Sequence, residues 1–191
     1  MKKTSSANPV MTRGGSGGAR QIAASRGATV LHVDDDPNDT ALLEAARRKA
    51  GVDFRLENVG DGDQAIAYLM GSGKYANRAN HPWPTLILLD LKMPRATGFE
   101  ILKWIRKHPD CKTVPVIVLS GSELQEDVRQ AYLVGANSYL VKPLGFGALV
   151  NLVKNVTATW LTPRPSVVMP SIAPESRRAV GNYRAETSPK R

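Results

Sequence analysis

Five polar residues in this sequence could together bind a metal ion and a phosphoryl group. They are Asp34, Asp35, Asp90, Ser120 and Lys142, and each stands at or just after the end of a short apolar run. Three carboxylates brought close together repel one another, so something must offset the repulsion. Mg²⁺ would do so, because proteins usually hold it with one or two carboxylates, waters and phosphate oxygens. We therefore predict Mg²⁺ as the cofactor.

The chemistry that suits this group is phosphoryl transfer to a carboxylate. Asp90 would act as the nucleophile. Lys142 would place a positive charge beside the phosphoryl oxygens, and the Ser120 hydroxyl would donate a hydrogen bond to one of them. The sequence thus predicts that Asp90, Lys142 and Ser120 carry the reaction.

A scaffold must bring these distant positions together, and the apolar pattern indicates which one. Short β-branched runs alternate five times with segments of helical spacing. The predicted strands are 29–33, 54–59, 86–89, 114–119 and 138–141. Runs this uniformly apolar are covered on both faces, which predicts an α/β fold with a parallel sheet between helices. In such sheets functional groups collect at the carboxyl ends of the strands.

Polar residues and glycines mark where the helices begin and end. Three N-cap patterns begin at Asp36, Asp61 and Ser122. Three glycines follow amphipathic stretches and predict helix ends, at Gly51, Gly71 and Gly135. His32, inside the first strand, is interpreted as a satisfied core or edge histidine rather than a ligand.

The net charge of +9 lies in the two ends of the chain. Residues 1–27 carry five basic and no acidic side chains, residues 161–191 carry six and two, and residues 28–160 carry 15 of each. The ends are rich in glycine or proline and cannot bury enough apolar surface to offset their ordering entropy. We predict disordered basic tails at 1–27 and 161–191 around one domain at 28–160.

The sequence predicts a cytoplasmic protein that does not enter a membrane. Cys111 is the single cysteine, so no internal disulfide can form, and no signal-peptide pattern is present. The longest apolar runs are far shorter than the roughly 18 to 20 residues that a bilayer span needs.

Four motifs occur in the order and at the intervals of a known family. They are VDDDP at 33–37, LLDLKMP at 88–94 with Gly98, VLSGS at 118–122 and GANSYLVKP at 135–143. Over residues 28–160 the sequence resembles the receiver domain of two-component response regulators. The resemblance implies a flavodoxin-like, doubly wound (βα)5 fold with five parallel strands in the order 2-1-3-4-5.

The resemblance also implies roles at the phosphorylation site. Asp90 matches the aspartate that accepts a phosphoryl group from a histidine kinase or phosphotransfer protein. Asp35 and Asp90 match the metal-binding carboxylates, Asp34 acts mainly through a metal-bound water, and the backbone carbonyl of Lys92 is a further ligand. Lys142 matches the phosphate-contacting lysine, and its bond to the following proline is expected to be cis.

Two further residues match the family's switch pair. The hydroxyl of Ser120 would move to the phosphoryl group and the ring of Tyr139 would follow inward. The new hydrogen bonds would bias a surface on the fourth helix and fifth strand between two states. The resemblance therefore implies a regulator that is not an enzyme and that signals by changed binding to a partner.

A finer resemblance concerns the partners. The long segment 71–84 and the run HPDCKTVPVIVLS at 108–120 resemble single-domain regulators that partner bacterial phytochromes. The partners implied are a sensor histidine kinase, such as a phytochrome, and a downstream phosphotransfer or target protein. A homodimer through the last helices is a further implication.

The sequence supports two other classes of function less well. An aspartyl-phosphate hydrolase usually has a second acid two residues after its nucleophile, and Lys92 stands there. Specific nucleic-acid binding would need a recognition module that 31 proline-rich residues cannot form. The alternative that stays open is a tail-assisted nucleic-acid-binding or scaffold protein that uses the receiver as a dimerisation switch.

Overall fold

The computed structural model describes residues 27–93 and 97–162. The tails predicted at 1–27 and 161–191 lie outside the described residues, except for Gly27, Leu161 and Thr162. Within the described ranges no helix is long and apolar enough to cross a bilayer. The elements, in chain order, are β1 (Thr29–Val33), α2 (Pro37–Ala50), β2 (Arg55–Val59), α3 (Gly62–Met70), η1 (Gly73–Tyr75), β3 (Leu86–Leu89), α4 (Gly98–Lys107), β4 (Val116–Ser120), α5 (Gln125–Val134), β5 (Ser138–Val141), α6 (Phe146–Val156) and η2 (Thr157–Leu161).

The five strands form one parallel sheet in the order β2-β1-β3-β4-β5. The predicted order 2-1-3-4-5 is thus confirmed. The chain fills one side of β1 with β2 and then crosses to β3 on the other side, so the strand order reverses between β1 and β3. The register pairs Val33 with Leu89, which sets the residues after both strands side by side.

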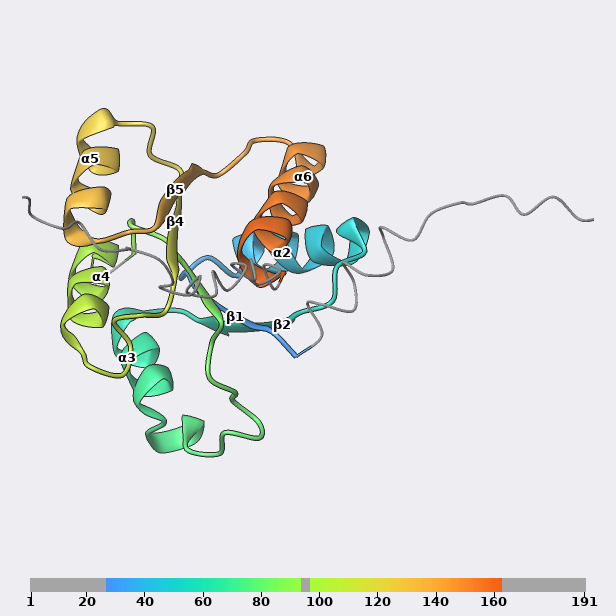
Figure 1. Cartoon of the computed structure of the whole chain (residues 1–191). Coiled ribbons are helices and arrows are strands. Elements are labelled where there is room, and N and C mark those ends of the chain that lie inside the picture. Colours follow the sequence, from blue (N-terminus) through green and yellow to red (C-terminus); the bar gives the residue numbers. More distant parts are fainter. Residues whose placement is uncertain (1–26, 94–96, 163–191) are drawn as a thin grey trace, which may run out of the picture.

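Helices cover both faces of the sheet, as the apolar strands predicted. Figure 1 shows α3, α4 and α5 on one face and α2 and α6 on the other. Alternate strand residues point to the two layers: Leu31 and Val33 pack with the first group, and Val30 packs with the second. The central strands β1, β3 and β4 are buried along their whole length, which makes them a rigid base for the groups at their ends.

Most predicted helix boundaries are confirmed. Asp36 and Asp61 cap α2 and α3, with side chains that accept from the amides of Asn38 and Gln64. The predicted glycines end three helices in the left-handed conformation, with φ of 68° at Gly51, 62° at Gly71 and 112° at Gly135.

The prediction that Ser122 caps α5 is wrong. The N-cap of α5 is Leu124, and the hydroxyl of Ser122 instead donates to the carboxylate of Asp127. Asp127, in the first turn of α5, therefore accepts the hydrogen bond of the Ser122 hydroxyl, and Ser122 does not cap the helix.

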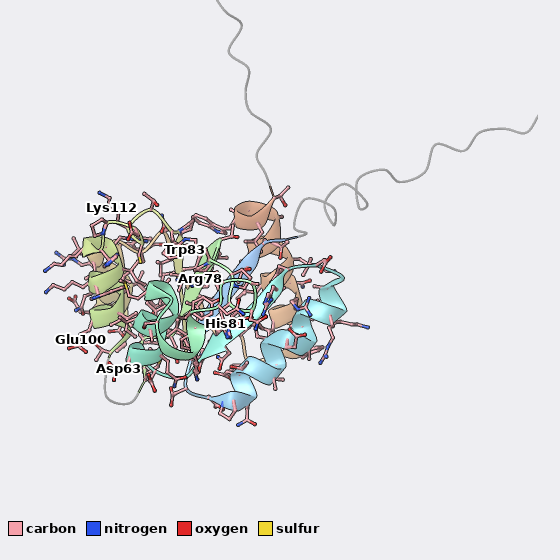
Figure 2. The ribbon with its side chains drawn as sticks, turned by 90° about the horizontal axis from the view of Figure 1, so that it is seen from below. Asp63, Arg78, His81, Trp83, Glu100 and Lys112 are labelled. Carbon is pink, nitrogen blue, oxygen red and sulfur yellow. The ribbon has the colours of Figure 1, made fainter. Side chains whose placement is uncertain are left out.

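One arginine ties the long connection between α3 and β3 to the end of α3. The Arg78 guanidinium donates to the carbonyls of Tyr68 and Leu69, both at 2.8 Å, at the carboxyl end of α3. It also lies over the ring of Trp83, 5.3 Å from the centroid, and Figure 2 shows it beside Trp83 and His81. Because helix ends leave carbonyls without intrahelical partners, this contact both caps α3 and fixes the loop.

Candidate functional site

Two buried carboxylates lie where the strand order reverses. Asp34 follows β1 and Asp90 follows β3, and they are 2% and 6% exposed. The amide of Asp90 donates to the carbonyl of Val33 at 2.9 Å, which ties the end of β3 to the end of β1. The sheet thus places the two carboxylates together at its carboxyl edge, as the sequence predicted.

Lys142, directly after β5, brings its ammonium group to these carboxylates. Its backbone amide donates to the carbonyl of Ser120 at 2.8 Å, which anchors the residue to β4. Its Nζ lies 2.7 Å from Asp34 Oδ2, 3.0 Å from Asp90 Oδ2 and 2.6 Å from Asp39 Oδ2. The cation therefore links carboxylates from β1, β3 and the first turn of α2.

The two oxygens of Asp90 have different surroundings. Oδ1 accepts from the amides of Leu91, at 2.6 Å, and Lys92, at 3.2 Å, whereas Oδ2 accepts from Lys142. The backbone around Asp90 is also tightly packed, because a Cβ built on Gly98 would lie 2.1 Å from the Asp90 carbonyl oxygen. Only glycine allows the start of α4 to approach Asp90 this closely.

The electrostatics of the site favour its charged forms. Burial raises the pKa of Asp34, but hydrogen bonds from His32, Lys142 and the amide of Asp36 more than offset it, so the pKa is about 2. Burial lowers the pKa of Lys142, but its hydrogen bonds to the three carboxylates raise it above the ordinary value. Lys142 therefore stays protonated and Asp34 ionised over the whole neutral range.

The two predicted switch residues, Ser120 and Tyr139, lie close to Ser122. Ser120 is fully buried, and its Oγ accepts from the amide of Ser122 at 3.4 Å. The hydroxyl of Tyr139 donates to the carbonyl of Ser122 at 2.8 Å, and burial raises the pKa of that hydroxyl. Both residues thus contact the segment between β4 and α5 rather than the carboxylates.

The site offers oxygen ligands of the kind that a hard cation such as Mg²⁺ prefers, but in the part of the chain that the structure describes they are not gathered into a closed metal site. Asp35 and Lys92 are exposed at the rim, beside the buried Asp34 and Asp90. Among the described residues, no three His, Cys, Asp or Glu side chains are grouped closely enough to hold a metal ion. Mg²⁺ keeps most of its waters and needs only one or two carboxylates, so the oxygen donors present are of the kind and number that it uses.

One expectation about the backbone is wrong. Residues 27–93 and 97–162 contain no cis peptide bond, so the bond between Lys142 and Pro143 is trans. Trans is the form that such bonds favour by about 0.5 to 1 kcal/mol when no other contact selects between the two.

The site also contains two residues that the sequence did not assign to it. Asp39 lies in the first turn of α2, and its carboxylate makes the shortest of the three contacts to Lys142 Nζ. His32 is buried and partnered, as expected, by Thr40 and Asn58, but its Nε2 also lies 3.3 Å from Asp34 Oδ2. The signal for Asp39 was its position in the first turn of α2, the helix that follows the carboxyl end of β1.

Comparison with known proteins identifies the family. A model described as the response regulator receiver domain matches residues 30–154. The response regulator Rcp1 of Synechocystis is 36% identical over 132 residues, which are 69% of this chain and 88% of Rcp1.

Solved structures agree with this match. The response regulator RPA3017 in red light signaling of R. palustris has a TM-score of 0.68 at 32% identity, over 72% of this chain and 99% of that one. The phosphorylated cyanobacterial phytochrome response regulator RcpA has a TM-score of 0.64 at 35% identity, over 70% and 94%. The Mn²⁺-bound form of Rcp1 has a TM-score of 0.62 at 34% identity, over 72% and 99%. The chain belongs to the response regulator receiver family.

Proposed function

We propose that this protein is a single-domain response regulator that accepts a phosphoryl group on Asp90 from a sensor histidine kinase. The observation that carries the proposal is the link from Lys142 Nζ to the buried carboxylates of Asp34 and Asp90. A nucleophile beside a fixed cation, at the carboxyl edge of a parallel sheet, is equipped to receive a dianionic group. In this proposal the protein is cytoplasmic, is not itself an enzyme and signals by changed partner binding.

The reaction is an in-line displacement at phosphorus. A carboxylate oxygen of Asp90 forms the new bond to phosphorus as the bond from phosphorus to the kinase's histidine nitrogen breaks. The electron pair of the broken bond stays on the imidazole, which takes up a proton from solvent. Lys142 holds its positive charge beside the phosphoryl oxygens throughout, because its pKa lies above the ordinary value.

Mg²⁺ is the proposed cofactor. Asp35 and Asp90 would hold it directly, Asp34 mainly through water, and the Lys92 carbonyl would be a further ligand. When bound, the ion would neutralise negative charge on the phosphoryl oxygens. The Mn²⁺-bound structure of Rcp1 supports a divalent ion in this family.

The hydrogen bonds of Ser120 and Tyr139 suggest how the signal leaves the site. When the Ser120 hydroxyl turns to the phosphoryl group, its bond with the Ser122 amide is lost. The segment after β4 then shifts. The hydrogen bond from the Tyr139 hydroxyl to the Ser122 carbonyl then breaks, unless the Tyr139 side chain moves with the segment. The proposed readout is a changed surface on α5 and β5, the fourth helix and fifth strand of the fold.

The proposed kinase is a phytochrome or a related sensor. RPA3017, a response regulator in red light signalling, and RcpA, a phytochrome response regulator, support this choice by their similarity to this chain. Exposed apolar side chains lie on α2 and just after Lys142, at Leu42, Leu144 and Phe146, where a phosphodonor has to approach. A downstream phosphotransfer or target protein and a homodimer through the last helices complete the proposed partners.

Replacing the acceptor tests the proposed function. Asp90→Asn should abolish labelling by acetyl phosphate in Mg²⁺, because an amide oxygen is a far weaker nucleophile than a carboxylate. Labelling is measured by intact mass and by sensitivity to hydroxylamine, which cleaves acyl phosphates. Asp110→Asn, in an exposed turn, is the control and should be labelled like the wild type. Hydroxylamine-sensitive label on Asp90→Asn would sink the assignment.

A further inference from the structure

The Lys142 ammonium has a complete set of three carboxylate acceptors, and the family resemblance gives a role in the site to two of these carboxylates. Its partners are the Oδ2 atoms of Asp39, Asp34 and Asp90, at 2.6, 2.7 and 3.0 Å. An ammonium group has three N–H donors, so each carboxylate takes one of them. The shortest of the three contacts is to Asp39, which is neither the acceptor nor one of the predicted metal ligands.

Asp39 differs from the other two carboxylates in its remaining hydrogen-bond partners. Asp34 also accepts from the amide of Asp36 and lies 3.3 Å from His32, and Asp90 also accepts from two amides. Lys142 is the one side-chain partner of the Asp39 carboxylate in the described part of the chain. Asp39 lies in the first turn of α2, outside the sheet, and its side chain is 34% exposed.

The lysine has room to leave this position. A small cavity of about 50 Å³ opens beside it, lined among others by His32, Asp39, Lys142 and Leu149. Lysine is a flexible chain with a point charge at its end, so packing alone does not fix its ammonium group. Two acceptors on fixed elements, Asp34 on the sheet and Asp39 on α2, are needed to aim the third N–H at Asp90.

We infer that Asp39 is a positioning residue for phosphoryl transfer, one that holds the Lys142 ammonium aimed at Asp90. The inference rests on the proposed function. When Asp90 is phosphorylated, a phosphoryl oxygen replaces its Oδ2 as the third acceptor, while Asp34 and Asp39 keep the other two N–H groups. The number of acceptors around the ammonium is thus the same before and after the reaction.

The first experiment is a double-mutant cycle on the full chain. The rate of phosphorylation by acetyl phosphate in saturating Mg²⁺ is measured for the wild type, Asp39→Ala, Lys142→Ala and the double variant. Asp39→Ala should slow the reaction about tenfold, as expected for loss of one charge-assisted hydrogen bond. In the Lys142→Ala background the same change should have less than a twofold effect, because the group that Asp39 positions is gone.

Other outcomes overturn the inference. Asp39 is also a negative charge near an anionic donor, and if that were its main effect, Asp39→Ala would speed the reaction in both backgrounds. An equal slowing in both backgrounds would show that Asp39 acts through the fold and not through Lys142. If the wild type is not labelled at all, the proposed function fails; if it is labelled and Asp39→Ala matches it, only the role of Asp39 fails.

A direct measurement of the lysine accompanies the cycle. The Lys142 ammonium should give a slowly exchanging ¹H–¹⁵N signal in the wild type that broadens beyond detection in Asp39→Ala. Asp63→Ala, in the first turn of α3 and exposed, is the matched control for loss of an acidic residue near a helix start (Figure 2). Its Lys142 signal should stay unchanged. Should Asp39→Ala unfold, Asp39→Leu keeps a similar volume, removes both acceptor oxygens and makes the same test; a persistent Lys142 signal there overturns the inference.

Discussion

At the scale of single residues, the site depends on a buried carboxylate that is kept ionised. Asp34 has a side chain only 1% exposed, yet its pKa is about 2 rather than the ordinary 3.8. Burial alone would have raised the pKa, so hydrogen bonds from His32, Lys142 and the Asp36 amide dominate. The acidic pocket is therefore held together by donors already present in the fold.

The depressed pKa predicts how stability depends on pH. A group whose folded pKa is lowered stabilises the fold above its unfolded pKa, and this stabilisation is lost as the pH falls toward the folded value. For Asp34 the window runs from the ordinary 3.8 down to about 2, and the amount lost is about 2 kcal/mol. We expect the wild type to have a larger unfolding free energy than Asp34→Asn above this window. The difference between the two should shrink as the pH falls through the window, as measured by urea unfolding at each pH.

The control for this prediction is Asp63→Asn, an exposed carboxylate on α3. Its unfolding free energy should follow that of the wild type in parallel from pH 5 to pH 2. A difference between wild type and Asp34→Asn that stays constant with pH would contradict the prediction.

At the scale of elements, the start of α4 is packed directly against Asp90, the proposed acceptor. A Cβ on Gly98 would lie 2.1 Å from the Asp90 carbonyl oxygen and 2.8 Å from the Leu91 Cα. Both are backbone atoms, which cannot move without moving the end of β3. Gly98→Ala should therefore lower the unfolding free energy by about 1 to 3 kcal/mol and slow labelling of Asp90.

Gly147 offers a control in which the same substitution should raise the unfolding free energy instead of lowering it. It lies within α6, and a Cβ built there meets no atom within 4 Å. Gly147→Ala should raise the unfolding free energy by about 0.5 to 1 kcal/mol, because alanine loses less conformational entropy in a helix. If both glycine variants are equally stable, close packing at Gly98 is not the reason for glycine there.

The loop between α3 and β3 yields a separate prediction. Arg78→Ala would remove the guanidinium donor from the Tyr68 and Leu69 carbonyls, leaving Tyr68 only the Gly71 amide, and would take the cation from Trp83. We expect a loss of about 1 to 2 kcal/mol in unfolding free energy and faster hydrogen exchange over residues 72–84. The labelling rate of Asp90 should not change, because this loop leads into the amino end of β3, whereas Asp90 follows its carboxyl end.

Arg129→Ala, an exposed arginine on α5, controls for loss of a positive charge. It should leave exchange in residues 72–84 at the wild-type rate. Unchanged exchange in Arg78→Ala would mean that other contacts hold the loop.

At the scale of the whole molecule, the sequence predicted the architecture well and the site less completely. Apolar runs and terminal glycines are local signals, so β1, β3 and β5 and the ends of three helices were predicted to the residue. Boundaries set by competition between side chains were not: Ser122 bonds Asp127 instead of capping α5. Asp39 was missed for a related reason, since its role depends on where Lys142 ends in space, 103 residues away.

The charge of the molecule predicts a property that is separate from signalling. The net charge of +9 lies in residues 1–27 and 161–191, whereas residues 28–160 are neutral. Changing the eleven Lys and Arg residues of these two ends to Gln should abolish retention on heparin in low salt, because counterion release depends on clustered cations. Elution in a salt gradient is the measurement.

The matched control changes cations on the domain. Lys103 and Lys107, both exposed on α4, are replaced by Gln and should leave the eluting salt concentration nearly unchanged. If the variant with neutral ends is still retained, the binding surface lies on the domain, which would favour the alternative of a nucleic-acid-binding or scaffold protein.

The reach of Lys142 also has a consequence for synthesis on the ribosome. Its three contacts join residues 52, 103 and 108 positions apart, so the site closes only when the last strand docks on a nearly complete sheet. A nascent or truncated chain that ends before residue 142 contains every predicted metal ligand and the acceptor, but lacks the cation. The Lys142 cation thus joins the site late in folding, and a kinase that meets an unfinished chain finds Asp90, the proposed acceptor, without the charge that would stabilise the transferred group.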